Sequence, residues 1–560
     1  MFRKLAPLDG IFLAAATGFF ALRIFLGRIL GVYFAADQHY DDALMIVYAD
    51  FQGHFAATNA PFNELLLKDL GYPIFLNLVK ITGLQYTDAL ACLWLLAAVS
   101  SVVLFARATG VSNRIIWLAI FVFVLFSPIA FDSWGGTRLY RNALLTPLYF
   151  IVLNAAAILF VLHMKNLPLE PKKFLAFQIL LGLIFTLTFY VKEDGAWLLA
   201  VLAAVTIICG GKILMAAKLA VEDKLRHLTI LILPLIIFFA GTSVYKAVNY
   251  KFFGVYEINI RGGGETGKFI QSVYKIQSDN RTGKIWAPAD AVAKAFDASE
   301  TLRANPKLRE AVFHTPWFGL DIYANPIKGD FLGWVLLTAV KDSGLCHSAA
   351  EQEEFFKKVN AEIDAAFENG TLQRDSKFQL VSSMGGRSAL EILKLAKIVL
   401  KEYAMHVALY KYEPGAWDMR SMPQSPEVAE IVAAASRLTN IDLTKPNEHA
   451  GAVNFFVRIL FVIFALVQTL LFFAAITGTY KTAVQFFHKK TFSLPALIAA
   501  GCFLLAIVYA LAIAWFSEFI SPSELRNSAV KFYSVGLVPM LASFEIFGAY
   551  LFHVSLKFKR

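Results

Sequence analysis

Residues 453 to 477 read VNFFVRILFVIFALVQTLLFFAAIT, an almost unbroken apolar run. The hydrocarbon core of a bilayer is about 30 Å thick, and a helix crosses it with about 20 apolar residues. Because lipid offers no hydrogen-bond partners to the backbone, a helix is the structure that a single run of this kind can adopt there. The run therefore predicts a membrane-spanning helix.

The rest of the chain repeats this pattern. Of its 560 residues, 58% are hydrophobic and 17% are charged, and the mean hydropathy is +0.57. These values are too apolar for a soluble protein of this length, so we predict an all-α polytopic membrane protein embedded in a lipid bilayer. About ten runs are long enough to span: 10–30, 88–107, 115–131, 142–163, 174–190, 195–212, 228–249, 453–477, 494–517 and 527–554.

The Lys and Arg residues of the short loops predict the orientation, because cytoplasmic loops retain positive charge during insertion. Most of these residues lie in loops that would share a side with the N-terminus, and few lie in the loops of the other side. We therefore expect an even number of spans and two cytoplasmic termini. The net charge of +10 follows from this topology and does not indicate a nucleic-acid partner.

The predicted spans divide the chain into three parts: an N-terminal membrane block (1–249), a polar extracytoplasmic insertion (250–452) and a C-terminal membrane block of three helices (453–560). We expect the insertion to be mostly helical. Ser348 and Glu351 form a capping-box pattern before apolar residues at helical spacing. A second stretch, roughly 388–412, mixes aliphatic and charged residues and could lie on the membrane surface.

Carboxylates gather in the first predicted outer loop. Asp41 and Asp42 follow the first span in a segment that holds several more acidic residues. Such carboxylates could abstract a proton or hold a divalent cation. The alternative is that they only cap a helix from Ala43 to Phe51, where they would favour its exposed N–H groups.

Arginines mark the next outer loop and the first span. Arg138 and Arg141 are three residues apart, so they would share one helix face at the mouth of a span. The guanidinium fork binds phosphate well, although snorkelling to the membrane surface explains such residues equally. Arg23 lies inside the first predicted span, where a charge usually faces a cavity or a partner.

A very short link between two spans carries Lys192, Glu193 and Asp194. These side chains must stay near the membrane surface and could face the acidic first loop, or they could simply cap a polar hairpin. The glycine-rich run 261–267 lacks the lysine and the following Ser or Thr of a phosphate-binding P-loop. We interpret that run as a flexible connector.

Taken in order, these features resemble the GT-C class of integral membrane glycosyltransferases, in particular its bacterial members. The resemblance rests on one span followed by Asp41-Asp42-Ala43 and then Lys68-Asp69-Leu70-Gly71-Tyr72-Pro73, where those bacterial proteins often have Lys-Gly-Pro-Gly-Tyr-Pro. Asp69 and Leu70 depart from that motif. The segment 192–197 is similar to an acidic-Gly-x-Trp pattern of the same proteins, and 333–336 is similar to part of their outer insertion.

The resemblance implies inverting transfer of a sugar from a polyprenyl-phosphate donor to a glycan, lipid or protein acceptor. The reaction would take place on the extracytoplasmic side of a bacterial inner membrane. The implied base is Asp41 or Asp42. The implied ligands of the donor phosphate are Arg138, Arg141, Arg23 and Arg526. The residues implied to orient the acceptor or to hold a possible divalent cation are Lys192, Glu193 and Asp194.

Two other classes of protein stay open at this point. A transporter or lipid flippase would also have about ten spans, with polar or broken helices near the membrane midplane in paired halves. The sequence shows no such repeat. An O-antigen polymerase or ligase would combine loop arginines with a histidine, for which His314 and His347 are candidates.

Overall fold

The computed structural model describes residues 7–36, 41–50, 68–166, 170–217, 219–316, 321–408, 425–445, 450–489, 493–520 and 532–557. These residues are helical apart from loops and one short antiparallel pair, β1 (Ile285–Ala287) with β2 (Ile327–Lys328). Nine helices among them are long and apolar enough to cross a membrane. They are α1 (Pro7–Leu30), α4 (Tyr86–Thr109), α6 (Arg141–Met164), α7 (Pro171–Phe189), α8 (Ala196–Met215), α9 (Val221–Phe253), α19 (Ala450–Lys489), α20 (Leu494–Ser517) and α22 (Leu537–Lys557). The expected all-α architecture is therefore present, with nine such helices among the described residues in place of about ten predicted spans.

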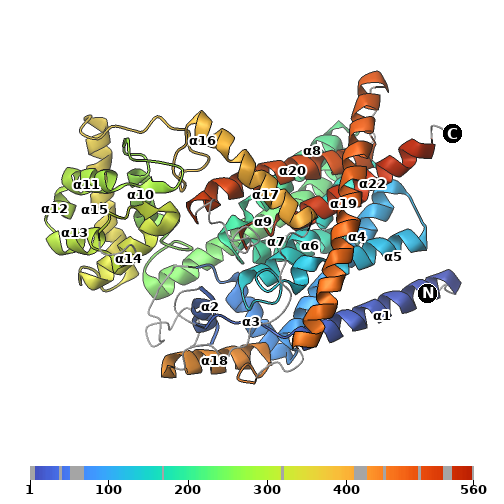
Figure 1. Cartoon of the computed structure of the whole chain (residues 1–560). Helices are drawn as coiled ribbons and strands as arrows, with labels where there is room; N and C mark the ends of the chain where they lie inside the picture. The colour runs from blue at the N-terminus through green and yellow to red at the C-terminus, as the bar shows by residue number, and fades with distance from the viewer. Residues whose placement is uncertain are drawn as a thin grey trace.

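The long helices form one block around α6. This helix is buried along most of its length and packs against α4, α7, α8 and α22. The insertion forms a separate lobe at one end of the block, where α9 leads into it (Figure 1). We call this the insertion end of the block. The start of α1 and the end of α22 both lie on the side away from the insertion (Figure 1).

The predicted span at 115–131 is wrong as a single helix. Helix α5 (Arg114–Leu125) ends early, and a 3-10 turn, η2 (Pro128–Phe131), follows it. Pro128 explains the break, because proline has no N–H to donate and disfavours helical backbone in the residue before it. The segment from α5 to the loop after η2 nevertheless lies alongside the whole of α1. Arg114 pairs with Asp9 near the start of α1, and the N–H of Tyr33, just beyond its end, donates to the Thr137 carbonyl oxygen.

The insertion has its own apolar core. Its elements are α10 (Gly264–Val273), α11 (Ala289–Ala298), α12 (Glu300–Arg303), α13 (Pro306–Phe313), η5 (Gly329–Phe331), α14 (Leu332–Asp342) and α15 (Ala349–Glu368), together with the β1–β2 pair. Trp286 and Phe356 lie at the centre of this core, and Phe519 of the 3-10 turn η7 (Glu518–Ile520) joins it from the end of α20. A membrane-block segment thus helps to build the insertion.

The predicted helix after Ser348 is confirmed. The Ser348 side chain accepts a hydrogen bond from the N–H of Glu351 at the start of α15. The Glu351 carboxylate accepts from the N–H of His347 instead of that of Ser348, so the reciprocal half of the capping box is shifted by one residue.

The segment predicted near 388–412 forms two helices, α16 (Ala389–Lys394) and α17 (Ala396–Val407), and α17 packs on α20. Leu393 and Leu400 are exposed on these helices, as expected for a segment at a membrane surface. Helix α18 (Pro426–Thr439) packs against α2 (Asp41–Asp50) and α3 (Gly71–Thr82). The last part of the insertion therefore returns to the membrane block.

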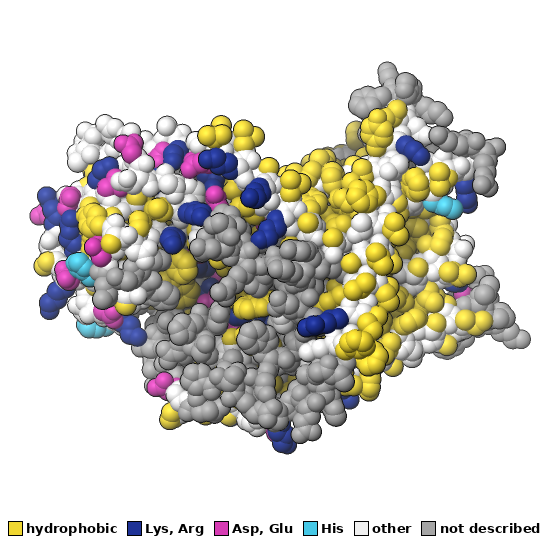
Figure 2. Space-filling model, viewed as in Figure 1, with side chains coloured by type: hydrophobic (Ala, Val, Ile, Leu, Met, Phe, Trp, Pro, Cys, Tyr) yellow, Lys and Arg dark blue, Asp and Glu magenta, His cyan; other side chains and the backbone are white. Residues whose placement is uncertain are grey.

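The two lobes differ in their surfaces. On the face shown in Figure 2, charged side chains gather over the insertion, and hydrophobic side chains dominate the helical block. Exposed apolar residues run along α19, where Phe456, Leu466 and Leu470 are each more than 60% exposed. A soluble fold would bury such a surface, so the block presents the exterior that a bilayer requires.

Helices α19 and α22 cross at a contact between small residues. A Cβ atom added to Gly478 would lie 2.3 Å from the carbonyl oxygen of Gly548 and 2.5 Å from the N atom of Phe552. Small residues let helix backbones approach closely, which is a common way for membrane helices to associate. Gly478 therefore sets the separation of these two helices.

We expect Gly478→Ala to lower the apparent melting temperature of the detergent-purified protein by several degrees, because overpacking costs about 1–3 kcal/mol. Gly501→Ala is the matched control, since Gly501 lies in α20 with open space where its Cβ would be. Thermal unfolding followed by tryptophan fluorescence measures both. Equal melting temperatures for the two variants would show that the crossing tolerates a methyl group.

Candidate functional site

A buried ion pair joins the first loop to the loop before α6. Both oxygens of the Asp42 carboxylate accept from Arg138, at 2.8 Å from Nε and 2.7 Å from Nη2. The two side chains are 0% and 3% exposed. Burial raises the pKa of Asp42, and the two-pronged bond to Arg138 opposes that rise and favours the ionised pair. Arg138 therefore binds both oxygens of the Asp42 carboxylate.

Aromatic rings enclose the other side of Arg138. Its Cζ atom lies 4.8 Å from the centre of the Trp134 ring, 5.2 Å from that of Tyr140 and 5.3 Å from that of Phe532. A guanidinium group is attracted to the faces of such rings. Arg138 thus holds α2, the 132–140 loop and Phe532, in the segment before α22, together.

Asp41 points to a different set of partners. Its Oδ2 atom lies 2.8 Å from Lys68 Nζ and 3.5 Å from Arg141 Nη2, and it accepts a hydrogen bond from the Tyr140 hydroxyl at 3.1 Å. Its side chain is 28% exposed. Burial acts to raise the pKa of Asp41, but Lys68 and Arg141 together lower it to about 2. Asp41 is therefore a carboxylate that solvent can reach.

Glu193 lies in the short turn η3 (Glu193–Gly195), and three positively charged side chains contact its carboxylate. Arg141 Nη1 lies 2.8 Å from its Oε2 atom, and Arg261 Nη2 and Lys68 Nζ lie 3.2 and 3.9 Å from its Oε1 atom. Burial acts to raise the pKa of Glu193, but Arg141, Lys68 and Arg261 lower it well below its ordinary value. Arg261 comes from the insertion, where it also pairs with Asp330 at 2.9 Å.

We call this group the charged cluster. Its members are Asp41, Asp42, Lys68, Arg138, Tyr140, Arg141, Glu193 and Arg261, joined by the contacts given above. They come from five segments that are distant in the sequence, and the pair of Arg261 with Glu193 joins the insertion to the helical block.

Close backbone packing places Lys68 in the charged cluster. The N–H of Gly71, three residues later, donates to the Tyr190 carbonyl oxygen at 2.7 Å. A Cβ atom at position 71 would lie 2.4 Å from that oxygen, so only glycine fits. The 68–73 segment therefore docks directly on the residues that lead to Glu193, which explains why the two motifs belong to one site.

Asp69 is a buried carboxyl group beside this contact. It is 4% exposed and accepts a hydrogen bond from Asn259 of the insertion at 3.1 Å. Burial raises the pKa of Asp69 to about 7, and the nearby negative charge of Glu193 contributes to the rise. Asp69 therefore changes its charge in the range where a general base works best.

The structure gathers most of the predicted site residues. Asp41, Asp42, Arg138, Arg141 and Glu193 all belong to the charged cluster. The alternative in which Asp41 and Asp42 only cap a helix does not account for their ion pairs, although α2 does begin at Asp41.

Two predicted residues lie outside the charged cluster. Lys192 donates to the Asn142 side chain at 3.2 Å, and its Nζ atom lies 5.2 Å from the centre of the Phe532 ring. Arg23 packs within α1 with its Cζ atom 4.2 Å from the centre of the Phe131 ring. In the part of the chain that the structure describes, no contact links Arg23 to the cluster. Arg526 and the side chain of Asp194 lie outside the described residues.

The sequence analysis missed part of the site. In the sequence, Lys68 stands out only as the first residue of a motif, and Tyr140 carries no signal of its own. Arg261 was placed in a flexible connector, but the glycine-rich run starts α10 instead. The Glu353 carboxylate accepts hydrogen bonds from the N–H groups of Glu265 and Thr266 and so orders this start. No sequence spacing signals that Arg261 reaches Glu193.

The resemblance also implies a possible divalent cation. Among the described ranges, no three His, Cys, Asp or Glu side chains are arranged to hold a metal ion.

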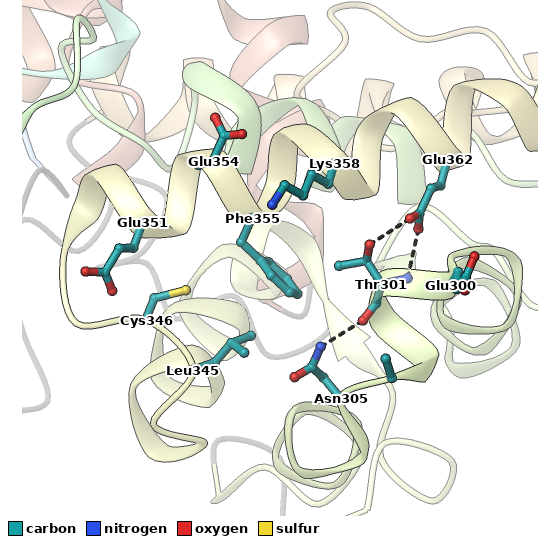
Figure 3. A pocket seen from close by; sticks show the side chains of 11 residues that line it. Glu300, Thr301, Asn305, Leu345, Cys346, Glu351, Glu354, Phe355, Lys358 and Glu362 are labelled. Atoms are coloured by element: carbon teal, nitrogen blue, oxygen red, sulfur yellow. Dashed lines mark hydrogen bonds between the residues drawn. The ribbon is translucent and has the colours of Figure 1, made fainter.

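A cleft of about 580 Å³ lies elsewhere, in the insertion between α12 and α15. Phe355 points into it, and Glu362 at its edge accepts hydrogen bonds from Thr301 (Figure 3). Its lining shares no residue with the charged cluster.

No protein-family model, curated protein or solved structure matches this chain. The resemblance to GT-C enzymes therefore remains a prediction.

We expect Asp42→Asn to destabilise the protein strongly, because breaking a buried ion pair typically costs about 3–5 kcal/mol. Asp9→Asn is the matched control, since Asp9 pairs with Arg114 but both side chains are about 30% exposed. A partly exposed pair contributes about 0–1 kcal/mol. Melting temperature and the yield of monodisperse protein in detergent are the measurements. Similar losses for both variants would contradict the anchoring role of Asp42.

We expect the effect of Asp69→Asn on the stability of the protein, relative to the wild type, to depend on pH. The folded pKa of Asp69 is raised from 3.8 to about 7, so the stability that its protonated form contributes is complete below pH 4 and is lost as the pH rises to 7. The melting temperature of the variant relative to the wild type should therefore increase between pH 4 and 7 and stay constant above. A difference that does not vary with pH would show that Asp69 is ionised in the fold.

Proposed function

We propose that this chain is an integral membrane glycosyltransferase of the GT-C type. It would move a sugar from a polyprenyl-phosphate donor to a glycan, lipid or protein acceptor. The single observation that carries the proposal is the position of Asp41, a solvent-accessible carboxylate within 3.5 Å of both Lys68 and Arg141. A base and a group of cations side by side suit a reaction that removes a proton and releases a phosphate.

The transfer needs one base and one stabilised leaving group. The acceptor oxygen attacks the anomeric carbon of the sugar, and the proton of its hydroxyl group passes to the Asp41 carboxylate. The bond from the anomeric carbon to the phosphate oxygen breaks, and its electron pair leaves with the polyprenyl phosphate. Cations placed where this negative charge grows lower the barrier.

Of the two adjacent carboxylates, Asp41 suits the role of base better. Asp42 is fully buried and binds Arg138 through both oxygens, so no acceptor can reach it without breaking that pair. The same pair occupies Arg138. The phosphate ligands are therefore better sought among Lys68, Arg141 and Arg261.

The location of the charged cluster supports the same proposal. A lipid-linked donor is confined to the bilayer, so its phosphate must be met at a membrane surface. The cluster joins the helical block to the insertion through the pair of Glu193 with Arg261. With the loop charges that favour cytoplasmic termini, the insertion end of the block would be extracytoplasmic in a bacterial inner membrane.

The polymerase or ligase alternative receives less support. His314 lies 3.7 Å from Glu310 on the surface of the insertion, and His347 donates its backbone N–H to Glu351. Neither histidine contacts the charged cluster in the described residues.

A transporter or flippase has one observation in its favour. Glu545 is fully buried within α22, where an ionisable side chain is expensive. Movement of a labelled lipid-linked sugar across proteoliposomes by the wild type, without any sugar transfer, would support this alternative over the proposed function.

We expect Asp41→Asn to reduce sugar transfer at least about 100-fold, the usual contribution of a general base. The assay uses purified protein in proteoliposomes, radiolabelled polyprenyl-phosphate sugars and a cell-envelope extract as the source of acceptors. Asp50→Asn is the matched control. Asp50 ends the same helix and pairs with Lys80 outside the charged cluster.

Asp69→Asn completes this experiment, because its buried carboxyl group is the competing base. Loss of transfer in Asp41→Asn with activity retained in Asp50→Asn and Asp69→Asn would identify Asp41. Unchanged transfer in Asp41→Asn would overturn the assigned role, and loss in Asp69→Asn alone would move the role to Asp69.

A further inference from the structure

Three cations from separate segments converge on one carboxylate. Lys68 follows the first loop, Arg141 begins α6 and Arg261 precedes α10, and all three lie within 3.9 Å of Glu193 oxygens. The Lys68 and Arg141 side chains are only 5% and 2% exposed. Buried cations of this kind need a negative charge between them, since burying them without one would be very costly.

Glu193 provides that charge in a form that a ligand can replace. A carboxylate and a phosphate both accept paired hydrogen bonds from guanidinium groups, so they suit the same cations. The Glu193 side chain is 31% exposed and stands on a three-residue turn. It can therefore turn toward solvent without moving a long helix.

We propose that Lys68, Arg141 and Arg261 form a binding site for the phosphate of a lipid-linked ligand, and that Glu193 occupies this site until the ligand displaces it. This inference rests on the proposed function and deepens it, because it names the groups that receive the donor phosphate. It also gives the insertion a part in the site through Arg261.

A tryptophan of the insertion reinforces this arrangement. The centre of the Trp334 ring lies 5.2 Å from Lys68 Nζ and 5.7 Å from Arg261 Cζ. A tryptophan face attracts cations, so Trp334 helps to hold these two side chains near each other when Glu193 leaves. The insertion thus contributes both a cation and a support for the site.

Displacement of Glu193 would also activate Asp41. Lys68 and Arg141 are the cations that lower the pKa of Asp41 to about 2. A phosphate bound to the same two cations places a second negative charge near Asp41 and raises its pKa. Asp41 would then become a stronger base only when the donor is present.

The test measures binding, independently of sugar transfer. The protein is placed in phosphatidylcholine nanodiscs and titrated with a short-chain polyprenyl phosphate, with the uncharged polyprenol of the same length as a control ligand. We expect Glu193→Gln to bind the phosphate about tenfold more tightly and Arg261→Gln to bind it about tenfold more weakly, the effect of one charge-assisted contact. Binding of the polyprenol should not change.

Lys80→Gln is the control variant. Lys80 pairs with Asp50 away from the charged cluster, so its loss should leave phosphate binding unchanged. Because Glu193→Gln removes charge between three cations, its melting temperature is measured as well. We expect it to fall without ligand and to rise more than that of the wild type when polyprenyl phosphate is added.

Each outcome has one meaning. Unchanged or weaker binding of the phosphate by folded Glu193→Gln would overturn the role of Glu193, and so would an equal gain for the polyprenol. Unchanged binding by Arg261→Gln would overturn the three-cation site. Sugar transfer by the wild type alongside either result would leave the proposed function standing, whereas the expected binding without transfer would support the site alone.

Discussion

The buried pair between Asp42 and Arg138 is the constraint on which the rest of the site depends. It joins residues 96 positions apart and holds α2 against the loop before α6. A charge buried this deeply is tolerated only when its partner is close and well aligned, so the pair allows α2 little freedom to rotate. Successive helix residues point about 100° apart, so fixing Asp42 also fixes Asp41. Asp41 then faces Lys68 and Arg141.

Two close approaches of the backbone complete the geometry. Gly71 contacts the Tyr190 carbonyl and so brings Lys68 beside Glu193. Gly264 has a φ of +65°, a conformation that favours glycine, and leaves room for the Glu353 carboxylate at the start of α10. That start lies three residues after Arg261. The positions of the two cations thus depend on two glycines in segments that the sequence presents as loops.

The sequence could predict the fold class because a membrane span is a local property of composition. The same reasoning failed at 115–131, where the apolar run continues past Pro128 although the helix cannot. Hydropathy counts apolar residues and does not register a missing N–H group.

The site could be predicted in part for a related reason. Asp41, Arg141 and Glu193 stand out as polar residues in short loops between apolar spans, and such loops must lie near one membrane surface. Arg261, Asp330 and Trp334 give no such signal, because the packing of the insertion decides where they lie. Lys68 stood in a recognised motif, but its contact with Asp41 depends on the docking of Gly71 on another loop.

In the site without ligand, the number of carboxylates equals the number of cations. This balance would affect which ligands the site selects. Lys68, Arg141 and Arg261 are matched by Asp41, Glu193 and Asp330. Uncovered cations at a membrane surface would attract the headgroup of any anionic lipid. In the proposed site a phosphate would instead have to replace an internal carboxylate, so only a ligand that gains further contacts there would remain bound. Pairing each cation with a carboxylate therefore weakens binding in general and makes it more selective, as a site surrounded by other phospholipids requires.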